Sequence, residues 1–542
     1  MDTFEWVINS LLDLIWNTPE NLPFMVVVLL SFGIFITIRL GFIQITRFSH
    51  GLKVVSGHYD DPNDEGDINH FQALSTALSA TVGIGNIAGV ALAIHFGGPG
   101  ALFWMWITAV LGMAIKFTEV TLAQEYRVTN EDGSVSGGPM YYIEKGLGPN
   151  WKWLAVAFSI AAAICAFLTG NAVQANTVAD VMLTEFQIPN AVTGLITAGL
   201  VGAVILGGIK RIGYVTSRLV PFMATLYVLG GLIVLIINYD SVIPSFIQIV
   251  TSAFNPQAGL LGVGSGAFIF TLSYGVQRGL FSNEAGQGSA PIAHSAAKTD
   301  QPVREGVVAL LEPFIDTLIV CTITGLVIVS TGAWDMYHSA TVFPTEDPVS
   351  YIVDEGDTPS ILYFEDGMPV NGSMMRYNVP VDTMFTDSEE SVLFNGRIEG
   401  IDSNPVIYQD NDSQLEALYG GVVENGAPLT VRAFEMGLSP LAGGGGFIVT
   451  IAVLLFAVST SISWSYYGDR AAQYLFGFKS IFWYRLVFVG MHFMGAITAL
   501  TTVWAFGDVM LGLMAFFNIV ALFALSGVIV KITKKYFENT EI

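Results

Sequence analysis

The stretch SATVGIGNIAGVA, residues 79–91, carries groups that could bind a small charged solute inside an otherwise apolar segment. Gly83, Gly85 and Gly89 each cost about 1 kcal/mol relative to alanine in a helix interior, so we expect the helix to break here. A broken helix presents main-chain N–H groups at the positive end of one half and carbonyl groups at the negative end of the other. The N–H groups suit a carboxylate, and the carbonyl oxygens suit Na⁺.

The residues of this break form the first candidate site. Those expected to meet a substrate carboxylate are Thr81, Gly83, Gly85 and Asn86. Gly83 and Asn86 are also candidate ligands of Na⁺. Close helix packing through the GxxxG spacing of Gly85 and Gly89 is the alternative, but it leaves Thr81 and Asn86 unexplained. A dinucleotide-binding loop is excluded, because no strand precedes the glycines and no βαβ unit follows them.

A second segment repeats the pattern in the other half of the chain. GNIAG at 85–89 recurs as SNEAG at 282–286, within the glycine-rich run FTLSYGVQRGLFSNEAGQGS. Each copy lies in the first span of a predicted block of five spans. Because five is odd, the second block would be inserted upside down relative to the first. Broken helices at matching positions of inverted repeats indicate the binding site of a transporter.

The second segment supplies further candidates. Tyr274 and Gly275 are expected near the start of its break and Asn283 near its end, all three at the substrate. Aromatic packing of Tyr274 is an equal alternative. Glu284 could bind the ion directly, but a carboxylate near Arg278 also fits an inner-gate ion pair. We favour the gate for Arg278 and Glu284.

Two other apolar segments carry polar residues at helical spacing. Gly170 and Gln174, in LTGNAVQANTVAD, lie four residues apart and share one helix face. In AVSTSISWSYYGD, Ser459 and Ser463 share a face, and Thr460 lies about 100° round the helix from it. Hydrogen bonding between helices or back to the same helix is the alternative for these side chains.

Trp464 follows these hydroxyls in the sequence. It is a candidate wall that would limit a substrate side chain to the size of alanine or glycine. Ordinary core packing is the alternative for a tryptophan at helical spacing.

Two further pairs of charged residues fall inside predicted spans. Lys116 and Glu119 lie three residues apart, so they can pair on one helix face, and we expect them to lock an inner gate or to reach towards the membrane surface. Glu312 and Asp316 lie four residues apart without basic neighbours in the sequence. Ionisable residues within a membrane are functional candidates by default, so an ion or proton role for this second pair stays open.

The amino-acid composition indicates that these residues lie within a membrane. Of 542 residues, 52% are hydrophobic and only 12% are charged, with a mean hydropathy of +0.58. About 20 apolar residues cross a bilayer as a helix. The chain is therefore a polytopic, all-α membrane protein. The expected spans are 22–41, 70–95, 101–125, 153–183, 190–208, 215–238, 262–293, 307–332, 446–472, 482–505 and 511–533.

Basic residues predict the orientation of these spans. With the N-terminus outside, 18 of the 22 Lys and Arg fall in connections on the cytoplasmic side, as the positive-inside rule requires. The C-terminus would then be cytoplasmic, and the protein would lie in the cell membrane. The first sixteen residues carry acidic but no basic residues, so an interfacial helix is expected rather than a signal peptide.

One long connection, 334–442, forms a separate segment. It holds 19 acidic residues against three arginines and so contributes −16 to the net charge of −23. Short apolar runs between turn residues predict a small β-rich extracellular domain. It is either a solvated acidic segment without a role in transport, or a lid or docking surface over the extracellular opening of the protein. The predicted division of the chain is 1–69, 70–240, 262–333, 334–442, 443–533 and 534–542.

Several motifs together resemble the alanine-or-glycine:cation symporters, also called sodium:alanine symporters. They are TALSATVGIGNIAGVALAIHFGGPGALFWMW, KFTEVTLAQEYR, SGGPMYYIEKGLG, GNAVQANTVAD, RGLFSNEAGQGSAPIAHSAAKTDQPVREG and STSISWSYYGDRAAQYLFG. The resemblance implies a LeuT-type inverted repeat of five plus five helices behind one extra N-terminal span. It also implies Na⁺-coupled uptake of alanine or glycine, with H⁺ coupling possible. The acidic segment departs from the family, in which the connection at this point is short.

The resemblance also assigns roles to residues. It places Gly170 and Gln174 at the substrate, the first as space for the ligand and the second as a hydrogen-bond partner. It implies that Ser459, Thr460 or Ser463 completes the shell of the sodium ion against carbonyls of the first break.

Other functions are disfavoured by the sequence. Neither an HExxH arrangement for an intramembrane metalloenzyme nor a GxxxxGK[ST] loop for ATP occurs, and an acidic surface repels nucleic acid. We expect no cofactor other than Na⁺ as coupling ion. A sensor built on the same fold is the remaining alternative to transport by alternating access.

Overall fold

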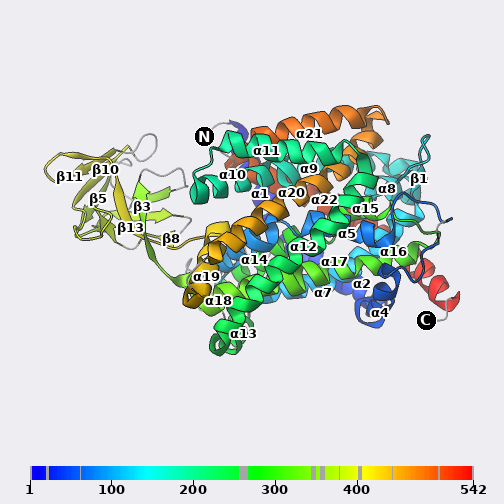
Figure 1. Ribbon diagram of the computed structural model, residues 1–542, viewed down its shortest axis with the longest axis horizontal. Helices are drawn as coiled ribbons and strands as arrows, with labels where there is room; N and C mark the ends of the chain where they lie inside the picture. Colours follow the sequence, from blue (N-terminus) through cyan, green and yellow to red (C-terminus); the bar gives the residue numbers. More distant parts are fainter. Residues whose placement is uncertain are drawn as a thin grey trace.

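The protein is an elongated helical bundle with a β-rich segment at one end (Figure 1). Its two termini lie at opposite ends of the bundle (Figure 1). The computed structural model describes residues 3–19, 23–61, 63–255, 266–343, 349–353, 361–376, 379–381, 383–400, 406–441, 444–498 and 501–539. We call the two ends of the bundle the insert end, which carries the strands, and the basic end, where the C-terminus lies.

The N-terminal region precedes the first block of helices. It contains α1 (Thr3–Leu12), η1 (Asp13–Asn17), α2 (Phe24–Arg39), α3 (Ile43–Thr46) and α4 (Phe48–Val55). The helix α2 packs along α7 and α22. It therefore lies outside the two repeated blocks, where the sequence predicts one extra helix.

The first block runs from residue 70 to residue 237. It contains α5 (His70–Thr81), η2 (Gly85–Gly89), α6 (Val90–Gly97), α7 (Gly100–Glu125), β1 (Val128–Thr129), β2 (Val135–Ser136), α8 (Pro139–Leu147), η3 (Pro149–Trp151), α9 (Lys152–Phe167), η4 (Leu168–Ala172), α10 (Val173–Phe186), α11 (Asn190–Ile205) and α12 (Gly208–Ile237). The strands β1 and β2 form a small hairpin, and α8 covers the basic end (Figure 1).

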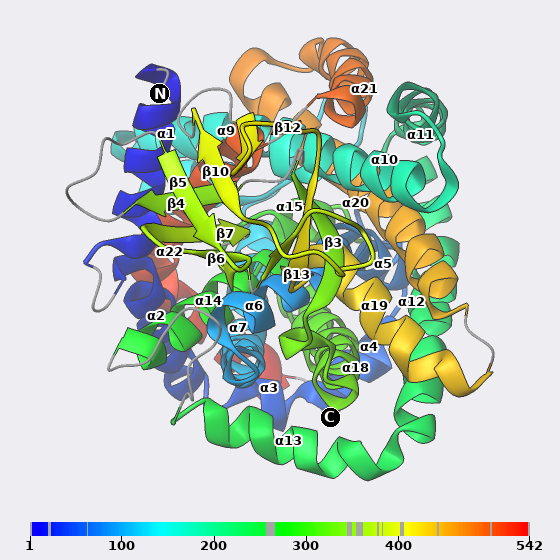
Figure 2. The same ribbon diagram turned by 90° about the vertical axis from the view of Figure 1, so that its left-hand side faces the viewer.

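The second block follows α13 (Tyr239–Ser252), which lies across the bundle axis at its periphery (Figure 2). The block contains α14 (Gly266–Asn283), α15 (Ala290–His294), α16 (Pro302–Ala309), α17 (Leu311–Pro313), η5 (Phe314–Cys321), α18 (Thr322–Thr331), η6 (Ala333–Asp335), α19 (Gly426–Leu438), η7 (Ser439–Leu441), α20 (Gly445–Phe476), α21 (Ser480–Ile497) and α22 (Thr501–Asn539).

Corresponding helices of the two blocks pack against each other. The second helices, α7 and α16, are in contact, as are the third, α9 and α20, and the fourth, α11 and α21. Two blocks that are related by an approximate twofold axis place equivalent helices next to each other. This arrangement agrees with the five-plus-five repeat that the sequence predicts.

The first helix of the first block breaks at the predicted place. A capping box at Asn69 and Gln72 starts α5. Val82 then leaves the helical region with φ −74° and ψ 84°, and α6 continues at an angle of 53° to α5. The prediction of a break within 79–91 is confirmed.

The first helix of the second block breaks later than predicted. The helix α14 continues through Tyr274 and Gly275 to Asn283, and the break begins at Glu284, whose φ is +55°. Gly286, with a φ of +88°, continues the break in a conformation that favours glycine. The prediction that Tyr274 and Gly275 stand at the start of the break is therefore wrong, because one glycine within an apolar helix is tolerated there by close packing.

Each predicted span coincides with helix in the part of the chain that the structure describes. Within the described residues, seven helices are long and apolar enough to cross a membrane, or eight if α5 and α6 count as one bent span. The helices α2 and α11 are apolar but shorter. Residues 262–265 of the predicted seventh span lie outside the described residues. The count of eleven spans stays a prediction.

The segment between α18 and α19, which we call the insert, contains strands arranged in antiparallel sheets. The strand orders are β12-β11-β10-β5-β6, β3-β13-β9 and β4-β7-β8. Their bounds are β3 (His338–Phe343), β4 (Val349–Val353), β5 (Ile361–Glu365), β6 (Met368–Pro369), β7 (Gly372–Arg376), β8 (Val379–Pro380), β9 (Met384–Phe385), β10 (Gly396–Glu399), β11 (Val406–Gln409), β12 (Gln414–Leu415) and β13 (Leu418–Val422). Leu362, Phe394, Ile398 and Ile407 belong to a hydrophobic core separate from that of the bundle.

The predicted boundary of this segment at residue 442 needs correction. The helix α19 falls inside the predicted range but packs against α18 and α20 of the bundle. Thr430 Oγ1 on α19 donates to the carbonyl oxygen of Ile87 in η2, at 3.1 Å. The strands therefore end at Val422, and α19 belongs to the helical bundle because its apolar face is buried there.

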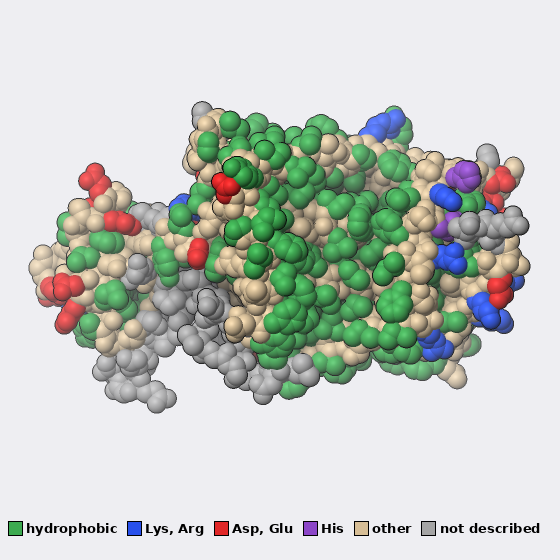
Figure 3. Space-filling model, turned by 90° about the horizontal axis from the view of Figure 1, so that it is seen from below, with side chains coloured by type: hydrophobic (Ala, Val, Ile, Leu, Met, Phe, Trp, Pro, Cys, Tyr) green, Lys and Arg blue, Asp and Glu red, His purple; other side chains and the backbone are tan. Residues whose placement is uncertain are grey.

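The bundle surface shows the expected division of charge. Hydrophobic side chains cover its flank between the two ends (Figure 3). Lysine and arginine side chains gather at the basic end, and acidic side chains dot the insert (Figure 3). An apolar belt bounded by charged ends is the surface that a bilayer requires.

Candidate functional site

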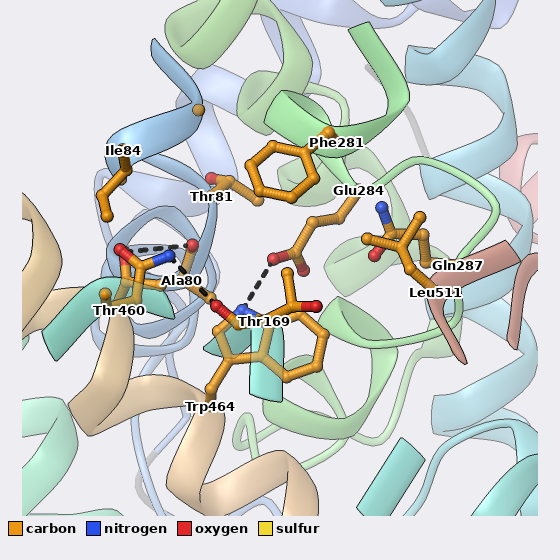
Figure 4. Close-up of a pocket in the computed structure, with 13 residues that line it drawn as sticks. Ala80, Thr81, Ile84, Thr169, Phe281, Glu284, Gln287, Thr460, Trp464 and Leu511 are labelled. Carbon is orange, nitrogen blue, oxygen red and sulfur yellow. Dashed lines mark hydrogen bonds between the residues drawn. The ribbon is translucent and has the colours of Figure 1, made fainter. Parts of the chain in front are cut away.

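A small cavity lies where the two broken helices meet (Figure 4). About 280 Å³ of space there is not filled by protein atoms, a volume that includes open solvent. The residues that line it are Ala80, Thr81, Gly83, Ile84, Gly85, Thr169, Gln174, Phe281, Glu284, Gln287, Thr460, Trp464 and Leu511. The structure thus brings together Thr81, Gly83, Gly85, Gln174 and Trp464 from the predicted substrate site.

The carbonyl end of the first break faces α20. Thr460 Oγ1 lies 3.1 Å from the carbonyl oxygen of Ser79 and 3.3 Å from that of Ala80. Ser459 Oγ lies 3.5 Å from the same Ser79 oxygen and 2.9 Å from the carbonyl oxygen of Phe456. Ser463 Oγ is buried and has no hydrogen-bond partner in the described part of the chain. Oxygen atoms of this kind suit a hard cation such as Na⁺.

The opposite end of the break is the N-terminal end of the helical segment that follows. Ile84 and Gly85, which line the cavity, stand at the N-terminal end of η2 and α6. The first N–H groups of a helix have no partner within the helix and carry the positive end of its dipole. An anionic group in the cavity would therefore be stabilised here.

Trp464 forms one wall of the cavity. It packs over Gly170, where any side chain would collide with the indole ring. Its Nε1 donates to Glu284 Oε1 at 3.0 Å, and Ser289 Oγ donates to the other oxygen of that carboxylate at 2.5 Å. Gly170 therefore acts through Trp464 and does not line the cavity itself. Gly170 belongs to η4, a π-helical turn of the kind that often marks a functional site.

Three polar side chains of the cavity keep unpaired atoms. Thr169 Oγ1, Gln174 Oε1 and Gln287 Oε1 are buried and have no hydrogen-bond partner among the residues that the structure describes. Gln174 uses only its Nε2, which donates to the carbonyl oxygen of Thr169 at 3.2 Å. Buried polar groups without partners are costly, so their convergence on one cavity indicates that a polar ligand completes them.

Asn86 lies beside the cavity and not in its lining. Its Oδ1 accepts from the Gly83 N–H at 2.8 Å, and its Nδ2 donates to Asp316 Oδ1 at 2.6 Å. Ser282 Oγ and Thr317 Oγ1 each donate to Asp316 Oδ2 at 2.7 Å. Asn86 therefore joins the first break to η5 and to the end of α14.

The remaining substrate candidates lie outside the cavity. Tyr274 stacks on Phe96 with ring centroids 5.2 Å apart. At Gly275 a Cβ atom would meet the carbonyl oxygen of Ala101 at 2.5 Å, which shows close packing of α14 on α7. Asn283 caps the break by accepting from the Ala285 N–H at 3.0 Å.

The intramembrane charges pair differently from the prediction. Lys116 Nζ lies 2.9 Å from Glu312 Oε2, and not against Glu119 as expected. Glu119 Oε2 accepts from Asn518 Nδ2 at 2.9 Å. The prediction failed because the partner comes from another helix, α17, which spacing along α7 does not reveal.

The predicted gate pair of Arg278 and Glu284 is also absent among the described residues. Glu284 is held by Trp464 and Ser289, while Arg278 Nη2 lies 3.9 Å from Asp508 Oδ2 on α22. The Arg278 guanidinium also lies 5.7 Å from the ring centroid of Phe281, a residue of the cavity wall. Arg278 therefore helps to cover the cavity instead of pairing with Glu284.

Arg127 links two main-chain segments at the basic end. It follows α7, and its guanidinium donates to four main-chain carbonyl oxygens. The acceptors and distances are Ser295 (3.1 Å), Ala297 (2.8 Å), Glu65 (2.9 Å) and Thr299 (2.8 Å). This clamp ties the segment before α5 to the segment after α15, the two ends of the broken helices.

Sequence reasoning missed several residues of this site. Thr169, Phe281 and Gln287 line the cavity, and Arg127 links two loops at the basic end, but none was a candidate. Thr169 and Phe281 are adjacent to residues that were singled out, so a wider window around each break would have found them. Nothing in the sequence around Arg127 indicates its four carbonyl partners, because they come from two distant loops.

Comparison with known proteins identifies the family. The sequence matches the profile of the sodium:alanine symporter family over residues 1–355 and 414–541. The chain belongs to the sodium:alanine symporter family. The unmatched stretch falls within the insert, between β4 and β12. The helical bundle with its cavity is thus the part of the chain that the family shares.

Individual relatives cover almost the whole chain. The sodium/alanine symporter AgcS of Methanococcus maripaludis is 41% identical over 99% of this chain and 98% of its own length. The putative sodium/proton-dependent alanine carrier protein YrbD of Bacillus subtilis is 33% identical over 96% and 90%, respectively. The probable sodium/glutamine symporter GlnT of the same organism is 31% identical over 98% and 90%. As a member of the family, the chain is a multi-pass membrane transporter.

Proposed function

We propose that the protein carries a small neutral amino acid, alanine or glycine, into the cell together with Na⁺ by alternating access. The observation that carries the proposal is the small cavity at the junction of both broken helices, in which Thr169 and Gln174 keep polar atoms without a partner among the described residues. The names of relatives that transport alanine with sodium support it.

The coupling ion would bind at the carbonyl end of the first break. Its ligands would be the carbonyl oxygens of Ser79 and Ala80 and the hydroxyl groups of Thr460 and Ser463. Thr460 already contacts both carbonyls, and the Ser463 hydroxyl is buried and free of partners. Neutral oxygen ligands at the negative end of a helix dipole favour a monovalent cation.

The substrate would lie next to the ion in the cavity. Its carboxylate would meet the N–H groups of Ile84 and Gly85, and its ammonium group the carboxylate of Glu284 and the hydroxyl of Thr169. The Trp464 ring lines this cavity and would limit the substrate side chain to the size of alanine or glycine.

The cavity is covered on both sides, which supports an occluded state of a transport cycle. Phe281 with Arg278, and α19 above η2, lie towards the insert end. The Arg127 clamp and the buried contact between His70 and Glu305 lie towards the basic end. Alternating access would open one cover at a time.

The orientation follows from charge. The lysines and arginines gathered at the basic end favour a cytoplasmic location for that end in the cell membrane (Figure 3). The insert, α19 and the N-terminus would then face outwards, and the C-terminus would be cytoplasmic.

Sodium coupling supplies enough free energy for accumulation. One Na⁺ moving inwards gains about 2.3 kcal/mol per 100 mV, and a tenfold sodium gradient adds about 1.4 kcal/mol. Together they sustain an accumulation of a neutral substrate of about 500-fold at one-to-one coupling. ATP is not needed for such a gradient.

The test is uptake of labelled alanine into proteoliposomes with Na⁺, Li⁺ and H⁺ gradients imposed separately. We expect an inward Na⁺ gradient alone to drive accumulation above equilibrium, and glycine and alanine to compete better than larger amino acids. Accumulation driven by H⁺ alone would establish the alternative of proton-coupled symport. High-affinity binding without any accumulation would favour a sensor.

A further inference from the structure

A chain of buried ionisable residues connects the basic end with the interior below the cavity. His70 Nδ1 contacts Glu305 Oε2, and Glu305 Oε1 lies 2.5 Å from His294 Nδ1. His294 Nε2 contacts Glu312 Oε1, and Glu312 Oε2 lies 2.9 Å from Lys116 Nζ. The proposed transport cycle uses none of these five side chains to bind substrate or Na⁺.

Each ring nitrogen of His294 lies against a carboxylate: Nδ1 against Glu305 and Nε2 against Glu312. A neutral imidazole carries one N–H donor and one bare nitrogen. It can donate to Glu305 or to Glu312, but its bare nitrogen would then face the lone pairs of the other carboxylate. Both contacts are attractive only if one extra proton resides on His294 or on one of the two carboxylates. The geometry of the closed chain therefore requires a bound proton.

Charge balance leads to the same conclusion. Glu305, Glu312, Lys116 and His294 are all 0% exposed in the ion pairs that they form. Two carboxylates and one lysine leave one negative charge uncompensated, and isolated buried charge is costly. One proton makes the group neutral. The other ionisable groups that face it are Asp60, Glu119, Arg127, Glu284, Arg304, Asp316 and Tyr467.

His70, the residue of this series nearest the basic end, lies on a helix that would move when the inner gate opens. His70 is the first residue of α5, the half-helix that the Arg127 clamp holds against the segment after α15. Its other ring nitrogen lies 4.0 Å from the partly exposed Asp60. Parting α5 from α16 would separate His70 from Glu305 and admit water to Glu305 and His294. The bound proton could then leave.

We propose that the His70–Glu305–His294–Glu312 chain is a proton-binding site of the inner gate, occupied when the gate is closed and released when it opens. This inference rests on the proposed alternating-access cycle. Because the closed state binds the additional proton, lowering the pH at the basic end favours closure, and raising it favours opening. For one proton the ratio of closed to open molecules rises at most tenfold per unit of falling pH.

The experiment measures the gate directly by pulsed electron spin resonance. Spin labels are attached at Phe71→Cys on α5 and Trp153→Cys on α9, both exposed positions, while Cys165 and Cys321 are buried and stay unlabelled. The label distance is recorded in Na⁺ without substrate between pH 6 and pH 8. We expect the population with α5 in place to increase as the pH falls.

The Glu305→Gln variant provides the decisive comparison. A glutamine amide can donate to the bare His294 nitrogen, so neutral His294 satisfies both neighbours and no extra proton is needed. We expect the pH dependence of the distance to disappear in this variant, and to remain in Glu125→Gln, an exposed residue at the end of α7. If Glu305→Gln does not fold, His70→Gln tests the same link, because it separates the proton site from α5.

The outcomes separate this inference from the proposed function. A wild-type gate that ignores pH, or a Glu305→Gln gate as pH-dependent as the wild type, overturns the proton site. Sodium-driven alanine uptake by the same preparation would leave the proposed function standing in that case. A pH-dependent gate in a protein without any uptake would overturn the proposed function alone.

Discussion

Thr460 on α20 contacts the last turn of α5, with its Oγ1 3.1 Å from the carbonyl oxygen of Ser79. The two residues are far apart in the sequence and belong to different repeats, so one hydroxyl bridges both halves of the protein. It also lies within hydrogen-bond distance of the Ala80 carbonyl oxygen. An ion bound there would hold the repeats together, which is a physical route for coupling Na⁺ to the movement of one repeat against the other.

The Thr460→Val variant should weaken sodium activation. Valine keeps the shape of threonine but removes one oxygen ligand. A lost contact to a charged group costs about 1.5–3 kcal/mol, so we expect the Na⁺ concentration for half-maximal uptake to rise about 10- to 100-fold. Alanine uptake at saturating Na⁺ should change little. Thr450→Val, whose hydroxyl bonds back to Gly446 on the same helix, is the matched control. Unchanged sodium activation in Thr460→Val would remove this residue from the ion site.

The Gly170→Ala variant should lose substrate binding through Trp464. The new methyl group would collide with the indole ring and push it into the cavity. We expect the affinity for alanine to fall at least about tenfold, measured by equilibrium binding. Adding Trp464→Phe to this variant should restore part of the affinity, because the smaller ring gives the methyl group room. Wild-type affinity in the single variant would contradict the proposed wall.

Asn86→Ala tests whether this residue supports the site or binds the ligand. The change leaves the buried Gly83 N–H without its partner and removes the Asn86 hydrogen bond to Asp316 Oδ1, while Ser282 and Thr317 still donate to Oδ2. We expect the free energy of unfolding to fall by about 1–3 kcal/mol and uptake to be lost together with it. Asn176→Ala, whose amide bonds to the Thr498 carbonyl at the surface, should keep both. Lost binding with unchanged thermal stability would place Asn86 in direct contact with substrate or ion instead.

Arg127→Met should loosen the closure at the basic end. It removes hydrogen bonds to four carbonyl oxygens in two segments, which lysine could not replace with the same fork. We expect faster hydrogen exchange, by at least about tenfold, in peptides covering 65–75 and 295–301. Arg218→Met removes an exposed arginine that lies over the Tyr214 ring and serves as control. Exchange in Arg127→Met at the rate of the wild type would show that other contacts hold the closure.

The insert should be dispensable for transport. Phe343 of β3 pairs with Leu418 of β13, so the strands at the base of the insert already form a hairpin stem. Replacing residues 344–417 by an Asn-Gly turn should leave α18 and α19 in place, because the removed core is separate from that of the bundle. We expect sodium-driven alanine uptake within about twofold of the wild type. A larger loss with normal expression would show that the insert takes part in opening the cavity.

Much of the helical framework could be predicted from the sequence. Apolar length and the distribution of basic residues depend only on the local chain and the bilayer, so the stretches that became α7, α12 and α20 were recognised with nearly correct bounds. The break after Thr81 was also predictable, since three glycines weaken a helix wherever it packs. The repeat of GNIAG as SNEAG located the second broken helix, although its break begins later than predicted.

The partners of the polar residues required the tertiary structure. The sequence placed Lys116 near Glu119, but burial in a membrane selects whichever charge packing brings closest, and that is Glu312. The sequence offered Asn86 as a ligand, whereas the fold turns its amide towards Asp316. Local composition determines where a chain crosses the bilayer and where its helices weaken. Contacts between distant helices decide which polar groups remain available to a ligand. A buried polar group bonds to whichever partner the packing of the helices brings next to it.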